Sequence, residues 1–377
     1  MPDRHAAVHL LRLLRGGLPQ GRHPHGHGDL RDQRLHPPGH DPRQGVHDRP
    51  DGRQEAPGRV LLPGAPGRGT SRLRPGGGPR AAGGRAPRPV IPARPVLVTG
   101  AGGLLGSALV RTGQVRGLRR EELDITDRDA VARVLDTLRP AAVINAAAQA
   151  RVDLAEVERA WTEAVNHHAV AALAEACRRR GIRLVHIGTD YSLRSDRDLT
   201  PDMPPDPRGH YAETKSRGER AALARGALVV RVQWVYHPGH PGFFTRSLQA
   251  LRRGETVRLV TDQVGVPTPA ALLAPALVIA ARGEATGMVH LACQGHTTPW
   301  GWIEAAAASL GLPFSAEPIT RADLGGAPRP ARSVLNSDSF AAAFGLRLPH
   351  WKVALGEVLA TAGAPAGEAG PATAPHR

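Results

Sequence analysis

The stretch YAETK places a tyrosine and a lysine, Tyr211 and Lys215, four residues apart. The chain has only three tyrosines and two lysines, so a chance pairing at this spacing is unexpected. On a helix, residues i and i+4 share one face. A phenol has an ordinary pKa of about 10, and a nearby ammonium favours the phenolate. We therefore expect Lys215 to lower the pKa of Tyr211 and to make it a general acid for a carbonyl oxygen.

Two further contributions to this chemistry are expected, one from Thr189 and one from Lys215. Thr189, at the end of the stretch LVHIGT, is placed to give a second hydrogen bond to the same carbonyl oxygen. Lys215 is also suited to hold a nicotinamide ribose. The competing interpretation is a tyrosine and a lysine on a solvated helix face, without a catalytic role.

The stretch TGAGGLLG, Thr99 to Gly106, contains three glycines at a spacing of three. It follows the apolar run PVLVT and opens a helix at Leu104 and Leu105, which is the setting of a dinucleotide-binding turn. Gly100 permits a sharp turn, Gly103 lets the backbone approach a pyrophosphate, and Gly106 allows close packing of helix on strand. The alternative is a glycine-rich turn without a ligand, in a chain that holds 44 glycines.

The elements around these residues alternate between strand and helix. Apolar runs predict strands at 95–99, 141–147 and 182–189, and periodic segments predict helices from 104, over 126–140 and over 155–180. This order predicts an α/β fold with a Rossmann-type doubly wound parallel sheet. We expect the cofactor-binding core at 94–231 and a smaller, mainly substrate-binding lobe at 232–361, with some segments returning to the core.

Within that second lobe, two helices are expected. The segment 242–254 should place Phe243, Phe244, Leu248 and Leu251 inward, and the apolar segment 268–283 should back the sheet. Trp300 and Trp302 are expected in the core, whereas Trp234, just after a strand, is the better candidate to face a ligand.

The net charge of +15 comes mostly from the N-terminal quarter, since residues 1–95 hold 17 arginines against 7 acidic residues. Residues 1–93 are rich in Arg, Gly, Pro and His and contain no aromatic residue, so they predict disorder. A nucleic-acid-binding arm is disfavoured because lysines and stacking side chains are missing. A solvated tail and a start codon set too far upstream both stay open. Residues 362–377 are expected to form a flexible tail.

The two cysteines, Cys177 and Cys293, lie far apart and predict buried thiols rather than a disulfide framework or a zinc site. No apolar run reaches the roughly 20 residues of a membrane span. We expect a cytoplasmic protein.

Several further stretches occur in order along the chain and are specific enough to suggest a family: LDITD, VINAAAQARVDLAE, LVHIGTDYS, RVQWVY, DQVGVPT and RPARSVLN. With TGAGGLLG and YAETK they resemble the extended short-chain dehydrogenase/reductase superfamily and, within it, the dTDP-4-dehydrorhamnose reductase family. The resemblance covers about residues 95–361. It implies reduction of the C4 ketone of dTDP-4-dehydro-L-rhamnose with NADPH or NADH.

The resemblance also implies residue roles. Thr189, Tyr211 and Lys215 match the catalytic triad. The expected sugar-nucleotide site is lined by Val152, Asp153, Tyr191 and Trp234. The expected cofactor contacts are Asp124 and Ile125 beside the adenine and Ala146, Ala147 and Ala148 at a strand end. Some members form a magnesium-dependent dimer, and no motif here settles whether this chain does.

Different residues of the sequence indicate which cofactor and which substrate the protein uses. Where a carboxylate would select NAD, this chain has Arg119 and Arg120, and guanidinium groups suit the 2′-phosphate of NADP. The family's common Thr before Val-Asp is replaced by Ala150-Arg151, and the loop after Tyr191 departs from the family pattern, which leaves the exact sugar open. Two alternatives also remain: another nucleotide-sugar epimerase, dehydratase or reductase, and a non-catalytic regulatory subunit of the methionine adenosyltransferase type.

Overall fold

The computed structural model describes residues 94–363. The predictions made for residues 1–93 therefore lie outside the described residues, as does most of the predicted C-terminal tail. The last helix, α13 (Trp351–Gly363), extends two residues into the segment expected to be tail. No helix among the described residues is both long and apolar enough to cross a bilayer.

A six-stranded parallel sheet forms the centre of this part of the chain, in the order β10-β5-β4-β3-β1-β2. Its strands are β1 (Val96–Thr99), β2 (Arg116–Leu118), β3 (Ala142–Asn145), β4 (Arg183–Thr189), β5 (Leu228–Val232) and β10 (Gly287–His290). The chain moves from β1 to β2 on one side and then to β3 on the other side of β1. Ligands of such sheets bind at this switch point, beyond the carboxyl ends of the strands.

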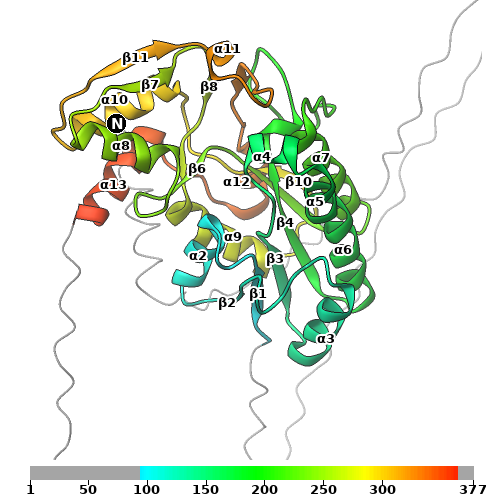
Figure 1. Cartoon of the computed structure of the whole chain (residues 1–377). Helices are drawn as coiled ribbons and strands as arrows, with labels where there is room; N and C mark the ends of the chain where they lie inside the picture. The colour runs from blue at the N-terminus through cyan, green and yellow to red at the C-terminus, as the bar shows by residue number, and fades with distance from the viewer. Residues whose placement is uncertain (1–93, 364–377) are drawn as a thin grey trace, which may run out of the picture. The chain divides into compact units, whose positions relative to one another are not determined.

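Helices cover both faces of the sheet (Figure 1), which confirms the predicted doubly wound α/β fold. One face carries α2 (Leu104–Arg111) and α9 (Ala270–Arg282), which pack on each other. The other face carries α3 (Arg128–Leu138), α6 (Val170–Arg179) and α7 (His210–Leu223). The two apolar clusters on either side of the sheet are therefore separate layers of one core.

The segment expected as one long helix over 155–180 is broken. It contains α4 (Val152–Val157), α5 (Arg159–Glu163), the π-helical turn η1 (Ala164–Ala169) and α6. Glu158 interrupts the first two because its φ of −90° and ψ of 51° are not helical. The wide turn η1 lies against α7 at Gly218, where a Cβ would stand 2.1 Å from the carbonyl oxygen of Asn166.

The second lobe contains short strand pairs and helices. Its strands are β6 (Val235–Tyr236), β7 (Val257–Val260), β8 (Val264–Gly265), β9 (Thr268–Pro269), β11 (Ala316–Ile319) and β12 (Arg332–Ser333), paired as β11-β7, β12-β8 and β6-β9. Its helices are α8 (Phe243–Arg252), α10 (Pro299–Ser309), α11 (Arg321–Leu324), α12 (Asp338–Phe344) and α13.

Most predicted core positions of this lobe are buried, with two exceptions, of which the first is Trp300: it is only partly buried, although it packs against the core. Phe244, Leu248 and Leu251 are buried, but Phe243 is 40% exposed, so its expected inward packing is wrong. Phe243 is the first residue of α8 and faces a cavity described below. Both cysteines are free and buried as expected, and burial raises the pKa of Cys177 to about 12.

Candidate active site

The glycine turn joins β1 to α2 with no room for side chains. Gly100 has a φ of 70°, and a Cβ there would stand 2.7 Å from the backbone of Ala147. A Cβ on Gly106 would stand 2.1 Å from the carbonyl oxygen of Gly100. Gly103 is the N-cap of α2 and offers no side chain to the first-turn N–H groups. These donors are the ones that anions bind at a helix N-terminus.

A cavity of about 290 Å³ opens beside this turn. It is lined by Gly100, Gly103, Arg120, Leu123, Asp124, Ile125, Ala146, Ala147, Ala148, Gln149, Trp161 and Val165. Eight of the fourteen predicted cofactor residues are among them, and the other six are not: Leu104, Leu105, Gly106, Arg119, Tyr211 and Lys215. Trp161 and Val165 were missed by the sequence analysis, because the broken helix that brings them to the cavity has no signature in the sequence.

Arg120 and Arg119, predicted together, have different surroundings. The guanidinium of Arg120 lies 4.4 Å from the centre of the Trp161 ring and 3.4 Å from Asp124 Oδ2. Burial alone would raise the pKa of Asp124, but hydrogen bonds from Thr126 and the charge of Arg120 together lower it. Arg120 therefore brings a fixed positive charge to the cavity, and Arg119 lies outside its lining.

Thr189, Tyr211 and Lys215 come together at the carboxyl end of β4. Thr189 is 5% exposed, and its hydroxyl is close enough to the Tyr211 phenol to lower the pKa of that phenol. Tyr191, in the short helix η2 (Asp190–Ser192), packs edge-on against Tyr211 with ring centres 5.6 Å apart. Lys215 is buried, and its Nζ donates to the carbonyl oxygen of Ile187 over 2.6 Å.

The expected lowering of the Tyr211 pKa by Lys215 is wrong for this structure. Burial raises the pKa of Tyr211, and the charges of Asp190, Tyr191 and Glu219 raise it further against a hydrogen bond from Thr189. Burial also lowers the pKa of Lys215 to about 8, although Glu219 opposes this change. The ammonium is directed at the main chain of β4 rather than at the phenol. The phenol consequently keeps its proton, which is the form that a proton donor requires.

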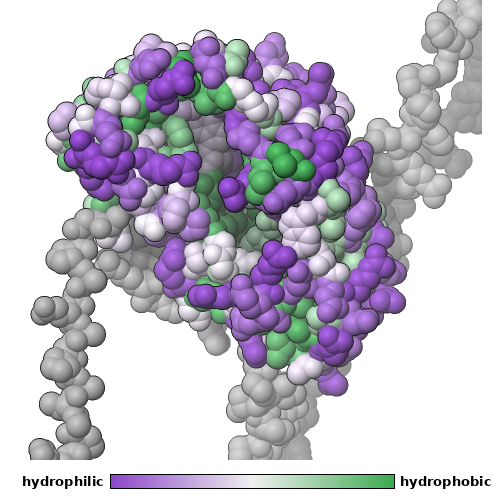
Figure 2. Space-filling view, viewed as in Figure 1, coloured by the Kyte–Doolittle hydropathy of each residue, from purple (hydrophilic) through white to green (hydrophobic). Residues whose placement is uncertain are grey.

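A second, larger cavity of about 440 Å³ is lined by Tyr191. Figure 2 shows a hollow in this face of the described residues, with hydrophobic residues at its floor and hydrophilic residues around its rim. Leu104, which follows Gly103, also lines this cavity, so the cavity begins where the glycine turn ends. Tyr191, which packs on Tyr211, lines this larger cavity and not the smaller one.

Two of the four predicted sugar-nucleotide residues, Tyr191 and Trp234, line the larger cavity, and Val152 and Asp153 do not. Asp153 instead holds the loop after α11: its carboxylate accepts bonds from Arg329 Nη2 at 2.8 and 3.0 Å and from Ala327 N at 3.0 Å. Arg329 itself lines the cavity. Asp153 therefore does not line the cavity itself but holds Arg329, which does.

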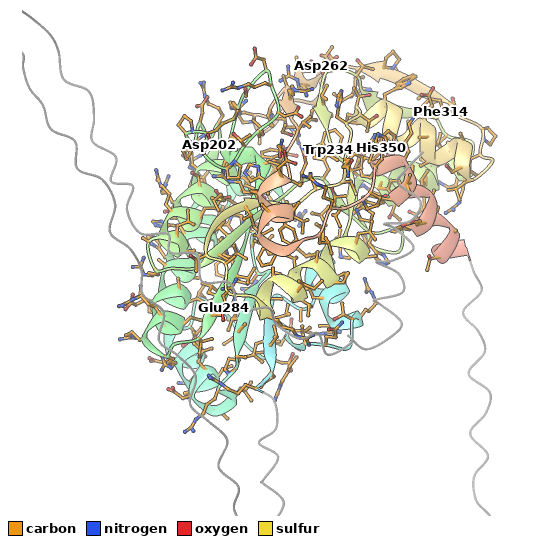
Figure 3. All side chains as sticks on the ribbon, turned by 180° about the vertical axis from the view of Figure 1, so that it is seen from behind. Asp202, Trp234, Asp262, Glu284, Phe314 and His350 are labelled. Atoms are coloured by element: carbon orange, nitrogen blue, oxygen red, sulfur yellow. The ribbon has the colours of Figure 1, made fainter. Side chains whose placement is uncertain are left out.

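Aromatic rings form the floor of the larger cavity. Trp234 adopts a φ of 38°, a conformation that is rare for a bulky residue. Its ring fits against Gly265, where a Cβ would stand 2.4 Å from it, and stacks on Trp302 at 6.1 Å. Figure 3 labels Trp234 among the packed side chains between the sheet and the lobe that carries Phe314. Trp302 is 5% exposed, as a core residue should be, yet it also lines the cavity.

Five basic side chains line the same cavity, three arginines and two histidines: Arg246, Arg258, Arg329, His237 and His240. None of the described residues that line it is acidic. The cavity therefore suits an anion next to an aromatic ring. The sequence analysis missed these residues, because single arginines carry no signal in an arginine-rich chain.

One group of potential metal ligands is found in residues 94–363: Glu163, His167 and His168. Arg217 Nη1 already contacts both carboxylate oxygens of Glu163 at 2.8 Å. None of these three residues lines either of the two cavities. A magnesium-dependent dimer stays a prediction.

Comparison with known proteins gives a consistent family. The model of the RmlD substrate binding domain matches residues 94–363. A dTDP-4-dehydrorhamnose reductase of Burkholderia thailandensis is 33% identical over 294 residues, covering 69% of this chain and 96% of the relative. A dTDP-4-keto-6-deoxy-D-glucose reductase of Streptomyces niveus is 35% identical over 276 residues, covering 69% and 94%. The crystal structure of dTDP-4-dehydrorhamnose reductase from Bacillus anthracis, in complex with NADP, has a TM-score of 0.69 and 25% identity, and covers 71% of this chain and 99% of that one.

Proposed function

The chain belongs to the RmlD family of dTDP-4-dehydrorhamnose reductases, which are NAD(P)H-dependent oxidoreductases, and from this we propose that it reduces the C4 ketone of dTDP-4-dehydro-L-rhamnose to give dTDP-L-rhamnose. The observation that carries the proposal is the placement of Tyr211 and Lys215 on α7 against Thr189 at the end of β4. Tyr211 packs on Tyr191, which lines the cavity of aromatic and cationic side chains, and Leu104 of the glycine turn lines the same cavity.

The smaller cavity fits a nicotinamide dinucleotide, which supplies the hydride when bound. Gly100 and Gly103 let the backbone approach the pyrophosphate, and the uncapped N-terminus of α2 offers it N–H donors. Arg120 supports NADP, because a guanidinium can pair with a 2′-phosphate. NAD is the second candidate, since Asp124 also lines this cavity.

The larger cavity fits the sugar nucleotide. Arg246, Arg258 and Arg329 supply charge for a diphosphate, and Trp302 and Phe243 supply ring faces for a base. Tyr191 packs on Tyr211 and marks the part of the cavity where the sugar would be reduced, and Trp234 lines the same cavity. Magnesium has no part in this assignment.

In the proposed reaction Tyr211 donates its proton to the C4 oxygen as that oxygen gains negative charge. Thr189 positions the phenol and gives the oxygen a second donor. Lys215 uses one of its three N–H donors on Ile187 and keeps the others for the nicotinamide ribose. Thr189 and Lys215 are buried and Tyr211 is partly buried, which limits competing water.

A second substrate, dTDP-4-keto-6-deoxy-D-glucose, is the other candidate, because a relative at 35% identity is named as its reductase. The two sugars place the same ketone before Tyr211. A non-catalytic regulatory subunit would keep the cofactor cavity but would have no use for the Tyr211–Thr189 pair.

The deciding experiment measures oxidation of NADPH by the purified full chain with each of the two ketosugars. We expect turnover with dTDP-4-dehydro-L-rhamnose and a fall in kcat of at least about a hundredfold in Tyr211→Phe. NADPH affinity, measured by fluorescence, should be unchanged in the variant and shows that it is folded. Equal rates in parent and variant would refute the proton donor, and cofactor binding without turnover would favour the regulatory subunit.

A further inference from the structure

Thr189 is followed by a buried carboxyl group that the proposed reaction does not use. Asp190 is 3% exposed, and its Oδ1 accepts the Thr189 hydroxyl over 3.3 Å. No cation pairs with this carboxyl in the part of the chain that the structure describes. A buried carboxylate without a cation is costly, so its placement beside Thr189 calls for an explanation.

The other oxygen of Asp190 faces donors from two distant segments. Gln233 Nε2 donates to Ser333 Oγ over 2.8 Å and lies 3.5 Å from Asp190 Oδ2. Because Ser333 Oγ accepts that bond, its own proton is free for its hydrogen bond to Asp190. The main-chain N–H of Leu335 donates to Gln233 Oε1 over 3.3 Å and fixes the direction of the amide. Oδ2 therefore meets donors, and Oδ1 meets Thr189.

The charged and titratable groups around Asp190 come from three elements. They are Tyr191 beside it on η2, Tyr211 and Glu219 on α7, and Arg231 on β5, which pairs with Glu219 over 2.8 Å. Burial raises the pKa of Asp190 to about 7, with Glu219 adding to the rise and bonds from Ser333 and Thr189 opposing it. Asp190 thus changes its protonation near neutral pH.

This change matters because Thr189 has only one hydroxyl proton. When Asp190 is ionised, the Thr189 proton is directed to Oδ1, and Thr189 can only accept from Tyr211. When Asp190 is protonated, the acid can donate to Thr189 Oγ1, and the Thr189 proton is free to turn toward Tyr211 and the ketone oxygen.

We propose that Asp190 is a positioning residue that sets the direction of the Thr189 hydroxyl, and that its protonated form aims this hydroxyl at the reacting oxygen. The inference rests on the proposed function for its consequence in catalysis. It does not require Asp190 to touch the substrate.

The test compares the pH dependence of kcat in the parent and in Asp190→Asn, from about pH 5.5 to about pH 9. Ser333 and Gln233 favour the amide oxygen on their side, so the amide nitrogen of the variant faces Thr189 as a permanent donor. In the parent, kcat should fall about tenfold or more as the pH rises through about 7. In Asp190→Asn, kcat at pH 6 should be within about threefold of the parent and should not fall. The control Asp196→Asn, in the exposed part of the same loop, should keep the parent profile.

A second variant, at Ser333, tests the same carboxyl through the donors that face its Oδ2. Ser333→Ala removes a donor that stabilises the ionised form, so the midpoint of the kcat profile should move to higher pH. A purely structural role would lower kcat equally at every pH and would not move the midpoint. The inference is overturned if Asp190→Asn keeps the parent fall, or if Ser333→Ala leaves the midpoint unchanged.

Infrared difference spectroscopy separates this inference from the proposed function. The carbonyl band of a protonated carboxylic acid should titrate near pH 7 in the parent and be missing in Asp190→Asn. If this band is absent, the inference fails even when the enzyme turns over. If the band is present and no ketosugar is reduced at any pH, the proposed function fails while the link between Asp190 and Thr189 stands.

Discussion

Glu219 holds the backbone of Thr189 in place from the neighbouring helix: its Oε1 accepts the Thr189 N–H over 2.9 Å. Its Oε2 accepts from Arg231 Nη2 at 2.8 Å, and both side chains are buried. Gly188 allows this approach, because a Cβ there would stand 2.6 Å from Glu219 Oε1. The proposed catalytic threonine is therefore fixed by an ion pair that joins α7, β4 and β5.

Breaking this ion pair should destabilise the protein strongly. Glu219→Gln would leave the buried Arg231 charge without a partner, and we expect a loss of about 3 kcal/mol in the free energy of unfolding. Urea unfolding followed by circular dichroism measures it. Glu213→Gln, on the exposed side of the same helix, should cost less than about 0.5 kcal/mol. Similar losses in both variants would contradict the assignment.

Filling the space at Gly265 should damage the substrate cavity. In Gly265→Ala, the new Cβ would meet the Trp234 ring at 2.4 Å and push it from its place on Trp302. We expect the KM for the nucleotide sugar to rise about tenfold, with the KM for NADPH unchanged. Gly356→Ala is the matched control, because nothing lies within 4 Å of its Cβ. An unchanged KM for the sugar would show that the Trp234 ring does not shape this site.

The two neighbouring arginines should differ in their effect on cofactor use. Arg120→Ala removes a charge that lines the cofactor cavity, so we expect the KM for NADPH to rise about tenfold while the KM for NADH changes little. Arg119→Ala should leave both values close to those of the parent. Steady-state kinetics with each cofactor tests this difference, and a larger effect at Arg119 would reverse the assignment.

The effects of substituting Asp153 and Arg329 on the free energy of unfolding should be coupled. A double-mutant cycle with Asp153→Asn and Arg329→Gln should give a coupling energy of about 1 kcal/mol in unfolding, since Asp153 is largely exposed. Limited proteolysis should cut the loop after α11 faster in each single variant. Additive effects in the cycle would mean that the ion pair does not secure the loop.

The buried Asp190 should make stability depend on pH in a defined direction. Its pKa is raised from 3.8 to about 7, so the folded state holds a proton that the unfolded state releases between these values. The contribution of Asp190 to the free energy of unfolding is then largest at low pH, falls as the pH rises to about 7, and is constant above it. Relative to the parent, Asp190→Asn should gain up to about 4 kcal/mol over this range. A difference between the two proteins that stays constant with pH would contradict the raised pKa.

The sequence predicted the sheet type and three of its six strands, β1, β3 and β4, because runs such as PVLVT and the glycine turn carry local signals that tertiary contacts reinforce. The long helix was wrong: the interruption at Glu158 and the wide turn η1 follow from packing against α7, which no local pattern encodes. The expected site residues lie around two adjoining cavities, and their roles stay predictions.

Electrostatic properties were the hardest to foresee. The spacing of Tyr211 and Lys215 suggested a lowered phenol pKa, yet burial outweighs the ammonium, whose Nζ bonds to Ile187 instead. Asp190 was overlooked for the same reason, since its surroundings come from residues up to 143 positions away (Asp190 to Ser333). Burial and partner identity are decided by the whole fold, and sequence spacing does not report them.

The central sheet is completed from the far end of the chain, because β10 pairs with β5 and α9 covers the face beside α2. A polypeptide released near Val232 would carry an open sheet edge and an unprotected apolar surface. The cofactor-binding half is therefore not expected to fold when it is produced without the rest of the chain. During synthesis it must wait for roughly sixty further residues before it can reach its native state.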